Sequence, residues 1–386
     1  MILTEFDHNE FLRTYWQREP LLIKHKGEAF VDPIDADELA GLACEHSIES
    51  RIVTHIPDND WQVRHGPFNA AVFEKLGEHN WTLLVQAVDL ADPDVADLKN
   101  YFKFLPSWRI DDVMVSFAST GGGVGPHYDQ YDVFLIQGKG SRRWQIGERC
   151  NSTTPLRNNT EMRLLENFVS RREVVLEPGD ILYLPPRIAH HGTALQDSLC
   201  YSVGFRAPSF AELLQGFCDE MTTTMSEDLR FEDSDSFDQV GGGALDKYSI
   251  QNVFDKLRNI TDQSSLLLDF FGKSVTEPRY PERIQAEINS PDTAALQALD
   301  QNSEILMVFH KNPNSRFAYL TNKEGHVLFV DGEKYLCQTD QMPLLKLLCN
   351  GFWPEQPELK GLLRSERDYA LIASLIAQGS LSIESN

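Results

Sequence analysis

The chain has 386 residues, of which 41% are hydrophobic and 10% aromatic, so it is long and apolar enough to bury the cores of two or three domains. Its 58 acidic and 35 basic residues give a formal net charge of −23, which argues against nucleic acid and anionic membranes as partners and favours cationic ones. No segment has the apolar length of a membrane span, and the N-terminus lacks the features of a secretory signal. The six cysteines form no CxxC pair, so we expect a cytoplasmic protein with reduced thiols.

The first hundred residues combine helix and strand signals. The segment "DADELAGLACEH" (35–46) has apolar residues at helical spacing, which predicts an amphipathic helix. The segment "WTLLVQAVDL" (81–90) is typical of a buried strand, and the following "ADPD" predicts a turn.

Residues 110–208 change to short β-prone segments separated by glycine and proline. Many short strands with regular turn signals predict an antiparallel sandwich or barrel. The predicted strands are "IDDVMVSFA" (110–118), "GPHYDQ" (125–130), "DVFLIQG" (132–138), "RRWQIG" (142–147), "REVVLE" (172–177), "DILYLP" (180–185) and "LCYSVGFRA" (199–207).

After residue 208 the pattern becomes helical, and after about residue 302 it becomes mixed. Apolar spacing predicts helices within 209–225 and 249–275, and the acidic, glycine-containing segment 226–246 between them predicts a mobile loop. The last section predicts a small α+β domain. Its expected strands are 304–310, 316–322, 326–332 and 334–338, and its expected helices are 342–350 and 366–379.

A metal site is suggested by the HxD sequence within "GPHYDQ". In a strand, His127 and Asp129 would point to the same face, although a surface ion pair would give the same short pattern. A third ligand is available in "EPGDILYLPPRIAHHG" (177–192), where the Pro-Pro pair ends one strand and His190 or His191 begins the next. Two imidazoles and one carboxylate on one face form the ligand set of non-haem Fe(II) oxygenases.

An arginine in "SRRWQIG" is a candidate for binding a carboxylate. Arg142 and Arg143 would lie on opposite faces of one strand, Arg142 with Trp144 toward the interior and Arg143 with Gln145 outside. A guanidinium matches a carboxylate with two parallel hydrogen bonds. Tyr131 would share the face of the HxD pair if that strand continued, either lining a channel or packing in the core.

These motifs resemble a known family. "GGGVGPHYDQYDVFLIQGKGSRRWQIG", "EPGDILYLPPRIAHHG" and "YSVGFRAP" are similar to the bacterial ribosomal oxygenases, within the JmjC and cupin-like 2-oxoglutarate oxygenases, and "FLRTYWQREPLLIKH" resembles the family's N-terminal opening. The resemblance implies a mainly β protein with helices. Its expected parts are a double-stranded β-helix (jelly-roll) oxygenase domain at 1–207, a helical dimerisation region at 208–301 and a winged-helix-like α+β domain at 302–386.

The resemblance also implies a site and an activity. It places His127, Asp129 and His190 as Fe(II) ligands and Arg142 as the binding residue for 2-oxoglutarate, because the family has no histidine at the position of His191. With O2 as second cosubstrate, the implied reaction hydroxylates the β-carbon of an arginine in a basic large-subunit ribosomal protein. The implied enzyme is a homodimer, and the net charge of −23 favours protein interaction over nucleic-acid binding for its C-terminal domain.

Other functions are compatible with parts of the pattern. The same chemistry would serve a histidine or lysine hydroxylase, or a demethylase, acting on another basic protein. A different class would be a non-redox cupin-type metal-binding protein or a zinc-dependent isomerase, which the complete HxD…H set together with Arg142 disfavours. The acidic surface would serve either solubility or the attraction of a basic substrate.

Overall fold

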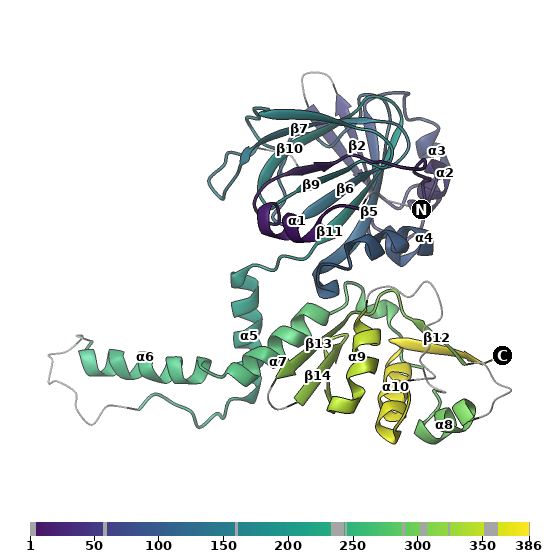
Figure 1. Ribbon diagram of the computed structural model, residues 1–386. Helices are drawn as coiled ribbons and strands as arrows, with labels where there is room; N and C mark the ends of the chain where they lie inside the picture. Colours follow the sequence, from purple (N-terminus) through teal and green to yellow (C-terminus); the bar gives the residue numbers. More distant parts are fainter. Residues whose placement is uncertain are drawn as a thin grey trace.

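The computed structural model describes residues 5–56, 60–158, 161–232, 243, 245–287, 290–301, 307–322, 325–350 and 362–385. Figure 1 shows a β-rich part made by the first half of the chain above a C-terminal part of helices and strands, with helix α5 leading from one to the other and α6 projecting to the side. Among the described helices, none has the length and apolar character needed to cross a membrane.

The β-rich part is a sandwich of two antiparallel sheets, as predicted. The larger sheet has the order β1-β9-β6-β11-β5-β4-β2-β3, and the smaller has the order β10-β7-β8. The sequence analysis identified neither β1 nor the hairpin of β2 and β3. The strands are β1 (Leu21–Ile23), β2 (Ser50–Ile56), β3 (Asp60–His65), β4 (Trp81–Val85), β5 (Ile110–Ala118), β6 (Val133–Gln137), β7 (Arg142–Arg149), β8 (Arg172–Leu176), β9 (Ile181–Leu184), β10 (Ile188–Ala194) and β11 (Ser198–Phe205).

The alternation of side chains along β6 divides the interior of this part into two cores. Phe134 and Ile136 join the large core on the outer side of the larger sheet. Val133 and Leu135 face the smaller sheet, where they pack in a cluster with Trp144. Successive residues of a strand point to opposite faces, so both faces of β6 are apolar and the strand is buried throughout. The space between the two sheets is the interior in which the candidate site lies.

Short helices cover the outer side of the larger sheet. Asp35 and Glu38 form a capping box at the start of the predicted helix. The predicted turn at 91–94 is instead the beginning of a helix, because Asp92 caps the amide of Val95 and Pro93 occupies the first turn. The helices are α1 (His8–Thr14), α2 (Ala36–Leu42), α3 (Ala70–Phe73) and α4 (Pro93–Ala96), with 3₁₀ helices η2 (Val88–Leu90), η3 (Asp97–Phe102) and η4 (Ser107–Arg109).

The predicted strand at 125–130 does not form. Gly125 has a φ of +81° and Pro126 has no amide hydrogen, so this segment does not enter a ladder. His127 alone makes an isolated bridge with His190, in which each amide donates to the other's carbonyl at 3.0 and 2.9 Å. The strand alternation that would have placed His127 and Asp129 on one face is therefore not what brings them together.

The remainder of the chain is helical and then α+β. The predicted helical segment 249–275 is interrupted at Asp262 and Gln263, giving α6 and α7. The sequence analysis missed α8 and β16, which pairs with β12. Of the predicted acidic loop, residues 226–232 contain no helix or strand and most of the rest lies outside the described residues. The elements are α5 (Phe210–Thr224), α6 (Lys247–Thr261), α7 (Ser264–Thr276), η5 (Pro281–Arg283), α8 (Thr293–Gln301), β12 (Met307–Lys311), β13 (Phe317–Asn322), β14 (Gly325–Val330), β15 (Glu333–Cys337), η6 (Thr339–Gln341), α9 (Met342–Cys349), α10 (Glu366–Gln378) and β16 (Leu381–Ser385).

Candidate metal centre

Three potential metal ligands from distant parts of the sequence meet between the two sheets. One ligand atom from each of His127, Asp129 and His190 lies within 4.8 Å of the other two, and no second group of this kind occurs among the described residues. The Asp129 Oδ2 atom is 3.6 Å from His190 Nε2 and 3.9 Å from His127 Nε2. These separations exceed hydrogen-bond distance, so the three atoms face a common point without bonding to one another.

The turn between β9 and β10 and the start of β10 position this group. After Pro185 and Pro186, Arg187 adopts a left-handed conformation with a φ of +69°, and its amide donates to the carbonyl of Asp129 at 2.6 Å. The pairing of β10 with β7 then shifts between Ile188 and His190. This bulge and the His127–His190 bridge hold the HxD segment against β10.

The two adjacent histidines of β10 point to opposite faces, as neighbours in a strand do. His190 is 3% exposed, and its ring centre is 5.9 Å from that of Trp144 in the interior. His191 contacts Trp61 and Phe168 instead, at ring-centre distances of 6.1 and 6.2 Å. Of this pair, the structure brings only His190 to the other two candidate ligands.

Hydrogen bonding prepares both imidazoles to bind a metal through Nε2. The Nδ1 atoms of His127 and His190 each lie 2.9 Å from a backbone carbonyl, that of Gly125 and that of Ile188 respectively. If each Nδ1–H donates to its carbonyl, the Nε2 lone pair is free for a cation. Burial first, and the nearby His127 second, lower the pKa of His190 to about 4, which keeps this ring neutral. Two imidazoles and a carboxylate fit a divalent iron ion.

The three candidate ligands open onto a cavity of about 570 Å³, a size suited to a small molecule. At its buried end lie Arg142 and Trp144, each 6% exposed. Tyr131 lines the same cavity and is 42% exposed, so it belongs to the solvent side and is not part of the core. The Asp129 charge, followed by burial, raises the pKa of Tyr131, which keeps the phenol protonated. The cavity therefore runs from solvent past the candidate ligands to a buried arginine.

Arg142 is a buried cation that makes no ion pair with a carboxylate in the described part of the chain. Its guanidinium donates to the hydroxyl groups of Ser116 and Ser198 at 2.8 and 2.9 Å, and its Nη2 also donates to their carbonyls at 2.9 and 3.0 Å. The expected double hydrogen bond to a ligand carboxylate is thus not available as the side chain stands, because Nη2 is already satisfied. Burial lowers the pKa of Arg142, and an anion beside it would compensate this cost. Arg143, on the other face of β7, is half-buried.

A carboxylate that the sequence analysis did not single out also lines the cavity. Asp112 is 5% exposed, accepts a hydrogen bond from Gln86 Nε2 at 2.5 Å and lies 3.2 Å from Arg279 Nη1. Burial, followed by the charges of neighbouring aspartates, raises its pKa to about 6. The alternation of side chains along β5 could have identified Asp112. Val113 and Val115 enter the large core, while the alternate residues face the cavity.

Family comparisons agree with this architecture. Residues 97–213 match the model of the JmjC domain, and residues 257–382 match that of the ROXA-like winged helix. The chain is 41% identical to the ribosomal protein uL16 3-hydroxylase of Escherichia coli over 70% of its own length and 72% of the relative's. It is 35% identical to a probable ribosomal oxygenase of Haemophilus influenzae over 78% of each chain.

Solved structures of E. coli YcfD have the same overall fold. One crystal structure matches with a TM-score of 0.86 and 34% identity over 99% of both chains. YcfD in complex with cobalt and succinic acid matches with a TM-score of 0.84 and 35% identity, again over 99% of both chains. YcfD with cobalt and 2-oxoglutarate matches with a TM-score of 0.81 and 33% identity over the same share.

Proposed function

The chain belongs to the ribosomal oxygenases that combine a JmjC domain with a ROXA-like winged helix, and we propose that it hydroxylates the β-carbon of an arginine in a large-subunit ribosomal protein. It is an Fe(II)- and 2-oxoglutarate-dependent protein hydroxylase. The observation that carries the substrate proposal is the relative's activity on ribosomal protein uL16, together with acidic residues in the cavity beside the candidate ligands. A ribosomal substrate also implies reaction in the cytoplasm.

In this proposal, His127, Asp129 and His190 hold the iron ion through Nε2, Oδ2 and Nε2. The bound metal supplies the activation of O2 that couples oxidation of 2-oxoglutarate to hydroxylation. Arg142 binds the distal carboxylate of 2-oxoglutarate, with Ser116 and Ser198 fixing the guanidinium. The apolar side chains that line the same end of the cavity exclude water.

The reaction itself tests the proposal against a non-redox metal protein. Purified protein is supplied with 2-oxoglutarate, O2 and a preparation of large-subunit ribosomal proteins, and succinate is measured. Succinate should form with Fe(II) and not with zinc, because zinc has no redox chemistry. Equal turnover with zinc alone would exclude an oxygenase. Turnover that requires a histidine or lysine in the substrate, and not an arginine, would favour the alternative targets.

The cavity offers an anchor for a cationic side chain in Asp112. This carboxylate is neutral below its pKa of about 6 and charged above it. The KM for an arginine-containing substrate should therefore fall as the pH rises from about 5 to about 7, by roughly tenfold if one charged hydrogen bond is gained. Initial rates at several pH values measure this change.

Asp112→Asn should remove most of this pH dependence and leave the KM high throughout. Asp94→Asn is the matched control, since Asp94 is an exposed residue of α4 outside the cavity. A KM that changes with pH to the same extent in Asp112→Asn would assign the titration to another group.

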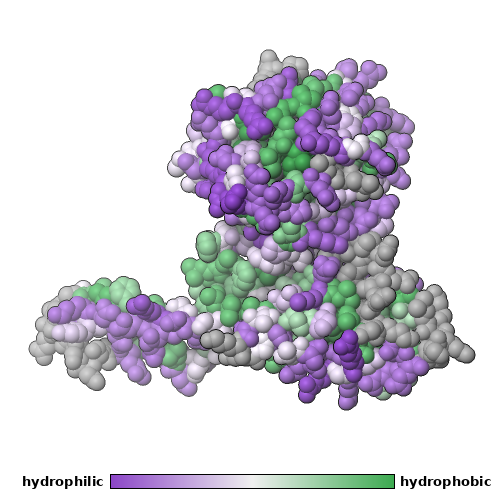
Figure 2. Space-filling model, viewed as in Figure 1, coloured by the Kyte–Doolittle hydropathy of each residue, from purple (hydrophilic) through white to green (hydrophobic). Residues whose placement is uncertain are grey.

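We further propose that the protein is a homodimer that associates through its helical region. The helices α5 and α6 expose large apolar side chains, among them Phe210 at 89%, Phe254 at 62%, Leu214 at 61% and Leu257 at 54% exposure. No residue of α6 is buried, and Figure 2 shows hydrophobic surface along this projecting helix and beside α5. Exposed apolar area of this extent is typical of an interface.

Light scattering at micromolar concentration should give twice the mass of the 43.9 kDa chain. The double substitution Phe254→Glu and Leu257→Glu should give the monomer mass, because burial of two carboxylates at an apolar contact is unfavourable. Lys256→Glu, a polar change within the same helix, serves as the control. A monomer mass for the unaltered protein would refute the proposed dimer.

The acidic surface should also accelerate encounter with a basic ribosomal protein. A chain of charge −23 attracts a polycation over long range, and salt screens this attraction. The KM for the basic substrate should therefore rise as ionic strength increases from about 0.05 to about 0.5 M, while kcat changes little because the chemical step takes place in a buried cavity. A KM that is indifferent to salt would leave solubility as the role of the charge.

A further inference from the structure

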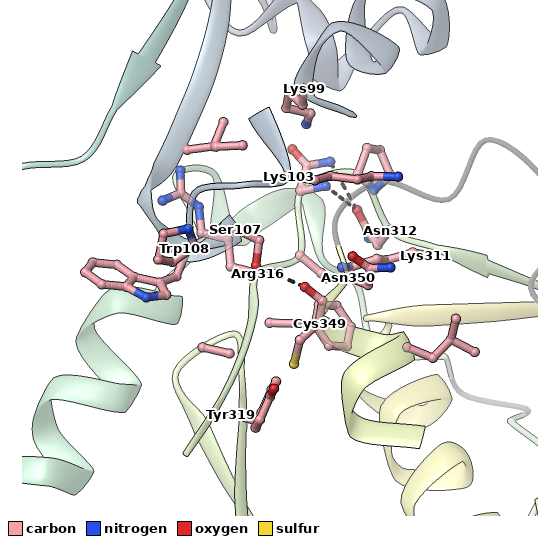
Figure 3. Close-up of a pocket in the computed structure, with 18 of the residues that line it drawn as sticks. Lys99, Lys103, Ser107, Trp108, Lys311, Asn312, Arg316, Tyr319, Cys349 and Asn350 are labelled. Atoms are coloured by element: carbon pink, nitrogen blue, oxygen red, sulfur yellow. Dashed lines mark hydrogen bonds between the residues drawn. The ribbon is translucent and has the colours of Figure 1, made fainter. Parts of the chain in front are cut away.

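A second and larger cavity, of about 790 Å³, lies outside the candidate metal centre. Figure 3 shows it between the segment that leads into β5 on one side and strands and helices of the C-terminal part on the other. It shares Asp111 and Arg279 with the cavity at the candidate ligands, so the two lie back to back. A volume of this size at a junction between domains is typical of a small-molecule site.

The lining of this cavity is strongly cationic in an otherwise acidic protein. It contains two carboxylates, Asp89 and Asp111, against six basic side chains: Lys99, Lys103, Arg279, Lys311, Arg316 and Lys346. The two carboxylates are already engaged, Asp89 with Lys99 at 2.7 Å and Asp111 with Arg316 at 2.8 Å. Lys103 and Lys346 form no ion pair with a carboxylate in the described ranges of the chain. An excess of positive charge therefore remains to be compensated.

Lys311 is one of the partly buried cations of this cavity. Its Nζ donates to the carbonyl of Leu348 at 3.0 Å and lies 4.1 Å from the ring centre of Phe317. Burial, with a further contribution from the charge of Lys99, lowers the pKa of Lys311 to about 8. The two lysines come from different domains, and an anion between them would relieve their repulsion.

The other polar groups of the cavity also favour an acceptor-rich ligand. The Nη1 atom of Arg316 is buried with no hydrogen-bond partner among the described residues. Asn314 bonds to Asn312, and Ser107 donates to the carbonyl of Cys349 at 3.0 Å, which closes the cavity between the domains. Figure 3 shows Lys99 and Lys103 on one side of the cavity and Tyr319 on the opposite side. Cations from both domains and an aromatic ring at one end of the cavity suit a ligand with an anionic and a planar end.

We propose that this cavity binds a small phosphate-bearing molecule of nucleotide size. A phosphate group presents several charged oxygens to lysine and arginine donors from both domains at once. The same chemistry occurs in the RNA backbone, but a net charge of −23 opposes the approach of a long polyanion. The cavity has room for a small molecule, whose charge would be offset locally by the cations that line it.

Calorimetric titration of the full-length protein with ADP, without added metal and at constant ionic strength, tests this inference. ADP should bind, and adenosine should bind at least about tenfold more weakly, because the phosphates supply the charged contacts. The double substitution Lys103→Met and Lys346→Met should weaken ADP binding by about tenfold or more, as should Lys311→Met. Lys75→Met, at an exposed position outside the cavity, is the control with the same loss of charge as Lys311→Met, and its affinity for ADP should match that of the unaltered protein.

The inference would be overturned if ADP does not bind, if adenosine binds equally well, or if ADP binding is unchanged in the double variant. Binding of a short single-stranded RNA through these lysines, without binding of ADP, would also overturn it and would point to RNA as the ligand. Lys103 and Lys346 are exposed, so the double variant is expected to fold even if Lys311→Met does not. Thermal unfolding of each variant separates loss of folding from loss of binding.

Discussion

Substitution of Asp129 by alanine is expected to reduce 2-oxoglutarate turnover more than about 100-fold. Changes to residues that only support a metal ligand already reduce metal affinity or activity by about 10–100-fold. The carboxylate is the only anionic member of the group of three and lies within 4 Å of both Nε2 atoms. The segment that carries it forms no strand, so the side chain is removed without breaking a ladder. Succinate formation and binding of Fe(II) in the same preparation measure the effect.

The adjacent histidines provide a matched comparison for the same claim. His190→Ala should lose turnover to the same extent, whereas His191→Ala should keep most of it, since His191 contacts Trp61 and Phe168 on the other face. Both variants remove an imidazole from β10, so a general weakening of the strand would affect both. Loss of activity in His191→Ala with retention in His190→Ala would refute the proposed ligand set.

Substitution of Arg142 by lysine is expected to raise the KM for 2-oxoglutarate by roughly 10- to 100-fold, the effect of losing one hydrogen bond from a charged donor. Lysine keeps the charge, but a single ammonium cannot reproduce the four bonds to Ser116 and Ser198 that orient the guanidinium. Arg142→Met, which removes the charge from the buried end of the cavity, should raise the KM further. Initial rates over a range of 2-oxoglutarate concentrations give both values.

Arg143→Lys is the control for Arg142→Lys, because Arg143 lies on the opposite face of the same strand. Its KM for 2-oxoglutarate should stay close to that of the unaltered protein at every salt concentration. An unchanged KM in Arg142→Lys, or a larger change in Arg143→Lys, would show that another cation binds the cosubstrate.

The sequence predicted the parts of the fold that depend on local periodicity. The strand at 110–118 has the expected bounds, and the capping residues around Asp35 and Ser209 start helices where the apolar spacing places them. The antiparallel sandwich followed from the density of short strands between 110 and 208. The alternation of side chains along a strand also predicted that Arg142 and Trp144 face the interior together.

Features that depend on long-range contacts could not be predicted in this way. The bridge between His127 and His190 joins residues far apart in the chain, and the HxD segment takes its position from that contact. Ser116 and Ser198, which occupy most of the Arg142 donors, come from two other strands. The cationic cavity likewise collects its lysines from segments separated by more than 200 residues, none of which is a basic motif by itself.

The most direct test of the proposed function is mass spectrometry of large-subunit ribosomal proteins from cells that produce either the unaltered protein or the Asp129→Ala variant. With the unaltered protein, one arginine-containing peptide should gain the mass of a single oxygen atom, and fragmentation should place that oxygen on the arginine β-carbon. The variant should leave the same peptide unmodified. Identical masses in both cell types, or an added oxygen on a different kind of residue, would contradict the proposal.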